Sequence, residues 1–273
     1  MELDDLFTQF TNERRYITSV TEATQIWYQT SWRCLGSRIS DLTKLNDVIV
    51  DLRKERPTLS EISINTYSRC INAFLRWAHT EGHLPALYKF PHLQEPKRER
   101  MVLSSDDIPK IKNWKPTGIN DQRVRVMALI ALDCGLRLTE IINMKKADVN
   151  LDQLLIRVMG KGRKERQVPM SIHLMKILFR WMDAEWLFKT STDKLISRSN
   201  AQRDIKVMGK KLNIRISFHR LRHKMATNYL SQGGHISQLR RILGHSSILT
   251  TQKYEHLETR DLVNNFSNLS TLR

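Results

Sequence analysis

The chain of 273 residues is poor in cysteine and has no long apolar run. Its three cysteines, Cys34, Cys70 and Cys134, stand far apart and form no C-x-x-C pair, which argues against a disulfide framework or a zinc knuckle. No apolar stretch approaches the ~20 residues of a membrane span. The acidic start "MELDDLFTQF" lacks the basic region of a signal peptide. We therefore expect a protein of the reduced cytoplasm that has no membrane partner.

Motifs for nucleotide hydrolysis and for zinc hydrolysis are also missing. The segment "GKGRKER" does not follow the G-x-x-x-x-G-K-[ST] pattern of a phosphate-binding loop, and the chain contains no H-E-x-x-H. Two histidine pairs, His79 with His83 and His219 with His223, have a four-residue spacing, but neither has an obvious third ligand. We therefore expect neither a metal nor another cofactor.

Acidic residues are few compared with basic ones. The 45 lysines and arginines against 28 aspartates and glutamates give a net charge of +17 and a pI of about 10.0. This excess is dispersed along the chain and indicates a polyanionic partner, with nucleic acid as the first candidate. The alternative is a basic soluble protein without a specific partner. The length suits two domains of roughly 100–200 residues each.

The pattern of apolar residues predicts a helical domain over residues 1–93. Apolar side chains recur at helical spacing on two segments, at Ile26, Trp27, Leu35 and Ile39 and again at Tyr67, Ile71, Phe74, Leu75 and Ala78. We interpret the aromatic residues as core rather than as platforms for nucleic-acid bases. Residues 94–103 are predicted to form a linker, because prolines and a basic cluster precede a new helix start at Ser104.

Residues 104–273 are predicted to form a second domain that mixes helices with a small sheet. "DQRVRVMALIALDCG" (121–135) is typical of a buried helix that ends at Gly135. "LLIRVMGKGRKERQVPM" (154–170) is typical of a strand, a turn and a second strand. A further helix is expected over 171–183, with helices continuing to the end. The predicted fold is mainly α with a small antiparallel β-sheet.

Two arginine motifs are candidates for binding phosphate. Arg137 follows Gly135 closely and could hold phosphate oxygens with its planar guanidinium, while Glu140, one turn later, could orient it. The alternative is an ordinary surface pair. His219 and Arg222 are three residues apart and share one face of a helix. The alternative there is a basic helix that lies on DNA phosphates.

Three further residues carry reactive groups. Lys161 lies between two glycines and can reach into a neighbouring site, although it could be a solvated hairpin lysine and Lys164 competes for the same role. His245 and Tyr254 are nine residues apart, which places them on opposite sides of one continuous helix. Because two side chains of one site cannot lie on opposite sides of a helix, we predict that Gly244 with Ser246 and Ser247 breaks the helix. Tyrosine is a possible covalent nucleophile, and lysine and histidine can transfer protons.

Four motifs in this order resemble those of tyrosine site-specific recombinases of the phage-integrase and Xer type: "CGLRLTEI", "GKGRKERQVPM", "HRLRH" and "LGHSSILTTQKYEHL". The resemblance covers about residues 102–257, and residues 1–93 resemble the family's core-binding domain more loosely. It implies that Tyr254 attacks the scissile phosphate and forms a 3′-phosphotyrosyl link. The other implied roles are phosphate binding by Arg137 and Arg222, protonation of the departing 5′-oxygen by Lys161, assistance of proton transfer by His219, and a hydrogen bond to the phosphate from His245.

The resemblance also implies the partners. We expect double-stranded DNA and a homotetramer on two DNA sites, in which the C-terminal tail (259–273) contacts a neighbouring protomer. We expect a minimal enzyme without a separate arm-binding domain, serving either a mobile element or Xer-like resolution. Alternatives are a one-site relative like a type IB topoisomerase and a DNA-binding protein that keeps the fold without catalysis. The expected DNA contacts are basic residues: Lys97, Arg98, Arg100, Arg163, Lys164 and Arg220.

Overall fold

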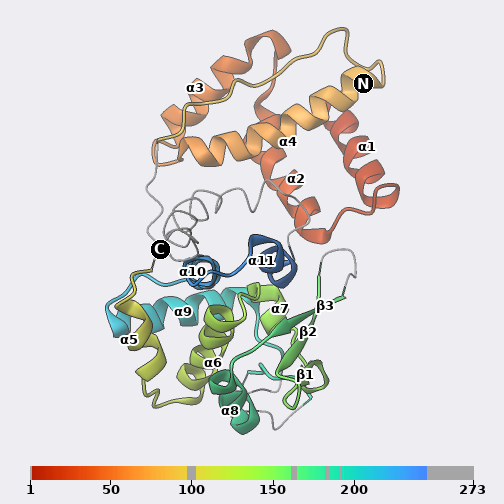
Figure 1. Ribbon diagram of the computed structural model, residues 1–273. Coiled ribbons are helices and arrows are strands. Elements are labelled where there is room, and N and C mark those ends of the chain that lie inside the picture. Colours follow the sequence, from red (N-terminus) through yellow and green to blue (C-terminus); the bar gives the residue numbers. More distant parts are fainter. Residues whose placement is uncertain are drawn as a thin grey trace, which may run out of the picture. The chain divides into compact units, whose positions relative to one another are not determined.

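The computed structural model describes residues 2–96, 103–160, 165–181, 185–190, 192 and 194–244. The chain divides into two compact units, Met1–Glu99 and Arg100–Arg273. Helices dominate both units, and the second also contains a small antiparallel sheet (Figure 1). The predicted fold class is therefore confirmed. In the ranges given above, no helix is both long enough and apolar enough to cross a membrane.

The described secondary structure of the first unit is entirely helical. Its described helices and 3-10 turns are α1 (Leu3–Tyr16), α2 (Glu22–Cys34), η1 (Gly36–Arg38), η2 (Leu42–Lys44), α3 (Leu45–Glu55) and α4 (Glu61–Thr80). The helix α4 packs against α1 and α2, and it buries the predicted face that includes Ile71, Phe74 and Ala78.

Aromatic side chains form the centre of the first unit. Phe7 stacks on Trp32 with ring centroids 4.2 Å apart, and Phe74 meets both rings edge-on. The indole N–H of Trp32 donates to Asp4, so its one polar atom is satisfied although the ring is buried. Phe74, which the sequence predicted to be core, is fully buried, and the predicted aromatics Trp27 and Tyr67 pack partly buried against the same core.

One predicted position of this core is wrong. Ile26 is 59% exposed, because the buried face of α2 contains Tyr28 and Trp32 instead. The helix ends at Cys34, and the chain continues into a 3-10 turn with Leu35 fully buried. The predicted apolar face required one continuous helix as far as Ile39. Because α2 ends at Cys34, its buried face differs from the predicted one.

The second unit holds the remaining elements. They are α5 (Asp107–Asn113), α6 (Ile119–Asp133), α7 (Leu138–Ile142), η3 (Lys146–Asp148), β1 (Val149–Asn150), β2 (Leu155–Met159), β3 (Glu165–Pro169), α8 (Ile172–Trp181), α9 (Arg198–Leu212), α10 (Phe218–Ser231) and α11 (Ile236–Leu243).

The central helix of the second unit is α6, which contacts α5, α7, α8, α9 and α10. It ends at Asp133, and Gly135 then adopts a left-handed conformation with φ of +65°. A Cβ atom at Gly135 would lie 2.9 Å from Leu243 Cδ2 and 3.0 Å from Met225 Sδ. Glycine is therefore required both by the backbone and by the space. The turn brings Arg137 to the start of α7.

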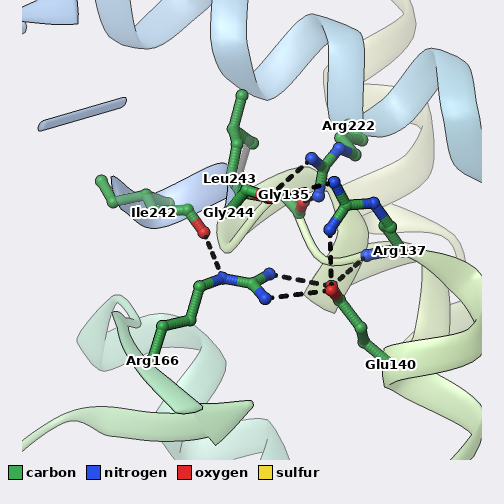
Figure 2. A network of polar contacts seen from close by, with 8 residues as sticks. All are labelled: Gly135, Arg137, Glu140, Arg166, Arg222, Ile242, Leu243 and Gly244. Atoms are coloured by element: carbon green, nitrogen blue, oxygen red, sulfur yellow. Dashed lines mark hydrogen bonds and ion pairs between the residues drawn. The ribbon is translucent and has the colours of Figure 1, made fainter. Parts of the chain in front are cut away.

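The sheet has the strand order β1-β2-β3 with antiparallel pairing throughout. The strands β2 and β3 form the predicted hairpin, and Val158 pairs with Arg166. Along β3 the burial alternates, so that Arg166 and Val168 share the inward side. The strand β3 also contacts α11, and Arg166 points toward Glu140 on α7 and toward the end of α11 (Figure 2).

Candidate active site

Three arginines converge on the C-terminal end of α11 (Figure 2). This helix ends at Leu243, and Gly244 caps it in the left-handed conformation, as the sequence predicted. Three consecutive carbonyl oxygens each accept a hydrogen bond from a different guanidinium: Ile242 O from Arg166 Nε at 2.8 Å, Leu243 O from Arg222 Nη2 at 2.8 Å, and Gly244 O from Arg137 Nη2 at 3.2 Å. Cations are favourable there because unpaired carbonyls give a helix C-terminus a partial negative charge.

Arg222 is the most buried of the three, with 8% of its surface exposed. It belongs to α10, which begins after Ser217, and the hydroxyl of Ser217 accepts a hydrogen bond from the backbone N–H of Arg220. Besides its bond to Leu243, Arg222 donates from Nη1 to the carbonyl of Gly135 at 2.6 Å. Two main-chain oxygens from distant parts of the chain thus fix the plane of this guanidinium.

Arg137 precedes the first residue of α7 and is held by Glu140. Its backbone N–H donates to Glu140 Oε2 at 2.8 Å, and its Nη1 donates to Glu140 Oε1 at 2.9 Å. The predicted pairing of these two residues is therefore present. The side chain of Arg137 is 41% exposed, whereas that of Glu140 is 5% exposed. Arg137 thus carries an oriented positive charge at the surface.

Arg166 completes this network, although no motif in the sequence predicted it. Its Nη1 and Nη2 donate to the two carboxylate oxygens of Glu140 at 3.0 and 2.9 Å. Its side chain is only 13% exposed. The signal in the sequence was the alternation of β3, which places a charged residue on the same side as Val168. A charge on an inward face requires an opposite charge or hydrogen bonds.

Glu140 lies between two guanidiniums and is ionised near neutral pH. Burial by itself raises the pKa of this carboxyl group. The hydrogen bonds from Arg166 and from the Arg137 backbone, together with the charge of Arg166, outweigh burial, so the pKa is lowered below its ordinary value. The carboxylate therefore remains a permanent acceptor for both arginines.

A cavity of about 670 Å³ opens beside this network. Arg137, His219 and Arg222 line it together with Arg198 and Lys206 from α9. Among the described residues that line it, the charged side chains are basic and none is acidic. The cavity therefore suits an anion. Among the residues that the structure describes, no group of three or more His, Cys, Asp or Glu side chains could hold a metal ion.

A second hollow, of about 530 Å³, shares Lys206 with the first. Lys210, Arg215 and Arg220 also line it, and the guanidinium of Arg220 donates to the carbonyl of Arg215 at 2.8 Å. Basic lining thus continues along α9 and the start of α10. Arg220, one of the predicted DNA contacts, lies in this second hollow.

The structure brings together three of the six predicted catalytic residues: Arg137, His219 and Arg222. The others lie outside the described residues, as do five predicted DNA contacts: Lys161, His245, Tyr254, Lys97, Arg98, Arg100, Arg163 and Lys164. Arg198 and Lys206 also line the cavity, and neither was predicted from the sequence. No motif marked these two residues, because only the packing of α9 places them there.

Known proteins resemble the chain in sequence and in fold. The sequence model of the phage integrase family matches residues 101–260. The tyrosine recombinase XerC of Yersinia pestis is 28% identical over 265 residues, covering 92% of this chain and 85% of that protein. XerC of Escherichia coli O157:H7 is 30% identical over 224 residues, covering 77% and 75%.

Two solved structures share the fold. The Tn1549 transposon integrase in complex with transposon right end DNA superimposes with a TM-score of 0.77 at 17% identity, covering 98% of this chain and 100% of that one. A lambda integrase dimer bound to a COC′ core site gives a TM-score of 0.74 at 17% identity, covering 93% and 95%. At this identity the likeness shows the fold alone.

The chain belongs to the phage integrase family. Within that family it is a tyrosine site-specific recombinase, an enzyme that breaks and rejoins DNA strands. The alternative of a DNA-binding protein without catalysis is not favoured by these relatives.

Proposed function

We propose that Tyr254 cleaves one DNA strand at a phosphate held by Arg137 and Arg222. The observation that carries this proposal is the basic cavity, in which these two guanidiniums and His219 meet. A planar guanidinium matches two oxygens of a phosphate. Two such groups can stabilise the negative charge that grows on the non-bridging oxygens in the transition state.

The proposed reaction exchanges one phosphate ester for another. The Tyr254 oxygen attacks phosphorus, the bond to the 5′-oxygen breaks, and a 3′-phosphotyrosyl link forms. The tyrosine proton leaves with assistance from His219, and Lys161 protonates the departing 5′-oxygen. His245 donates a hydrogen bond to the phosphate. A 5′-hydroxyl then attacks the phosphotyrosine and reverses the sequence, so no ATP is consumed.

The proposed partner is double-stranded DNA, bound by both parts of the chain. Residues 1–93 act as the core-binding domain, 94–103 as the basic linker and 104–273 as the catalytic domain. The relatives solved with DNA support this assignment. The proposed contacts to the DNA backbone in the second unit include Arg198, Lys206 and Arg220, since these line the basic hollows. The role is integration and excision of a mobile element, or Xer-like resolution.

The proposed active assembly is a homotetramer on two DNA sites. The tail, residues 259–273, carries Leu262, Val263 and Phe266 on one side of an expected helix, and this apolar face would dock on a neighbouring protomer. Mass photometry of a variant without the tail should show single-site complexes but few two-site complexes. An unchanged yield of two-site complexes would exclude this role of the tail.

The proposed function is tested by trapping the covalent complex. The purified protein is incubated with DNA that flanks its own gene, denatured complexes are recovered, and the attached 3′ ends are sequenced. We expect adducts at one short sequence. Adducts spread over many sequences would indicate a topoisomerase-like activity, and the absence of adducts would overturn the proposal.

Arg137→Lys is expected to lower the cleavage rate by at least about 10²-fold, the order seen when one oxyanion donor is removed. Lysine keeps the charge but loses the planar fork that binds Glu140 and phosphate together. The measurement is single-turnover cleavage at saturating DNA. Arg125→Lys, on α6 and with its guanidinium on the carbonyl of Lys112, is the control. Near-normal cleavage by the Arg137 variant would remove Arg137 from the phosphate site.

A further inference from the structure

Arg166 contacts three separate elements of the site from one side chain. It starts from β3, its Nη1 and Nη2 bind Glu140 on α7, and its Nε binds the carbonyl of Ile242 on α11 (Figure 2). Its guanidinium carbon also lies so close to Gly244 that a Cβ there would be 3.0 Å away. Gly244 has φ of +63° and is the last residue before His245. Arg166 thus holds both the carboxylate of Glu140 and the C-terminal end of α11.

We propose that Arg166 is a positioning residue for DNA cleavage: it compensates the charge of Glu140 and thereby leaves Arg137 oriented toward the scissile phosphate. This inference rests on the proposed function, because it assigns Arg166 a part in the same site. In this role Arg166 affects DNA cleavage without contacting the DNA.

The hydrogen bonds that Glu140 accepts from the two arginines support this role. Arg166 gives the carboxylate two guanidinium hydrogen bonds, whereas Arg137 gives it one guanidinium hydrogen bond and one from the backbone. The charge of Glu140 is therefore compensated mainly by the more buried arginine. Without Arg166, a carboxylate that is 5% exposed would attract Arg137 alone. The guanidinium of Arg137, which already donates one hydrogen bond to Glu140, would then be drawn further toward the carboxylate and away from the phosphate.

The hairpin adds a second link to the reaction. The strand β3 begins at Glu165, four residues after Lys161, and Arg166 is its second residue. Bonds from Arg166 to α7 and α11 tie this end of the hairpin to the arginine network. Loss of Arg166 should therefore affect the catalytic rate through Arg137 and through the start of β3, the end of the strand nearest Lys161 in the sequence.

The test compares two substrates that differ in charge at the scissile phosphate. One is the normal phosphodiester, and the other is a single stereoisomer of the methylphosphonate, in which a methyl group replaces one non-bridging oxygen. Because the methylphosphonate is neutral, displacement of Arg137 should slow its cleavage less than it slows cleavage of the phosphodiester. Arg166→Met is expected to slow cleavage of the phosphodiester by about 10- to 100-fold, the scale of a misplacement of about 1 Å. The rate of Arg166→Met divided by the wild-type rate should be at least about tenfold higher on the methylphosphonate than on the phosphodiester. A factor of ten corresponds to about 1.4 kcal/mol.

The matched control is Arg157→Met on the neighbouring strand β2. Arg157 is half-exposed and pairs with Asp148, so it tests the loss of an arginine from the same sheet. We expect equal rates relative to wild type on both substrates for this control. Arg166→Lys keeps the positive charge but cannot bind both oxygens of Glu140 and Ile242 together. It should show the same substrate dependence with less effect on the melting temperature.

Three results would overturn the inference. Equal slowing of Arg166→Met on both substrates would mean that Arg166 acts only on stability. Weaker DNA binding with normal cleavage at saturating DNA would mean that Arg166 contacts DNA directly. Additive effects of Arg137→Lys and Arg166→Met would mean that the two residues act independently. If wild type itself forms no covalent complex, the proposed function fails as well, and the two failures are thereby distinguished.

Discussion

Tyr254→Phe is expected to abolish the covalent protein–DNA complex on a nicked suicide substrate, while the affinity for DNA stays within a few fold. Phenylalanine lacks the hydroxyl that attacks phosphorus, so the step has no nucleophile. Affinity should persist because many phosphate contacts contribute to binding and a single hydroxyl contributes little beside them. Covalent complexes are measured on denaturing gels and affinity by titration of labelled DNA.

The control for this experiment is Tyr229→Phe on α10. The hydroxyl of Tyr229 donates to Gln238 at 2.7 Å, so this variant loses a tyrosine hydroxyl in the same unit. It should form the covalent complex at a rate close to wild type. A covalent complex that persists in Tyr254→Phe and disappears in another tyrosine variant would reassign the nucleophile.

Lys161→Ala is expected to slow cleavage of ordinary DNA by about 10²- to 10⁴-fold, the usual contribution of a positioned general acid. The departing 5′-oxygen is an alkoxide and needs a proton. A departing thiolate, with a pKa near 8.5, does not. The variant should therefore recover much of its rate on DNA in which sulfur replaces the bridging 5′-oxygen. Variants of Arg137 and Arg222 should not recover, because their proposed role concerns the non-bridging oxygens.

The control for Lys161 is Lys164→Ala, three residues away in the same hairpin segment and equally charged. It should cleave ordinary DNA at nearly the wild-type rate. Recovery with sulfur in Lys164→Ala, combined with a slow Lys161→Ala on both substrates, would move the acid to the other lysine.

Local signals predicted much of the fold. Glycines marked the end of α6 and the end of α11, because both Gly135 and Gly244 have positive φ. The strand–turn–strand pattern of residues 154–170 predicted β2 and β3, the mostly apolar segment 121–135 predicted the buried helix α6, and the helical spacing of residues 171–183 predicted α8. Ile26 was misplaced because the predicted face ran through Ile39, whereas α2 ends at Cys34 and buries Tyr28 and Trp32.

Less of the candidate site than of the fold could be predicted from the sequence. Arg137 and Glu140 are three residues apart, so helical spacing alone predicts their contact. Arg166 lies 26 residues from Glu140 and 76 from Ile242, and no local rule connects such positions. The charge on the inward face of β3 showed that a partner was required, but only the packing of the hairpin on α7 and α11 identifies it.

The three carbonyls at the end of α11 have a consequence for how freely this protein can change in evolution. The acceptors for Arg137, Arg166 and Arg222 there are main-chain oxygens of Ile242, Leu243 and Gly244. Substitution of a side chain does not remove a main-chain oxygen. A change of apolar side chain at position 242 or 243 therefore leaves the acceptors in place, although the full burial of Leu243 restricts the size of its replacement. Position 244 is constrained by its φ and by its contact with Arg166. Mutational robustness in this part of the site thus comes from the backbone.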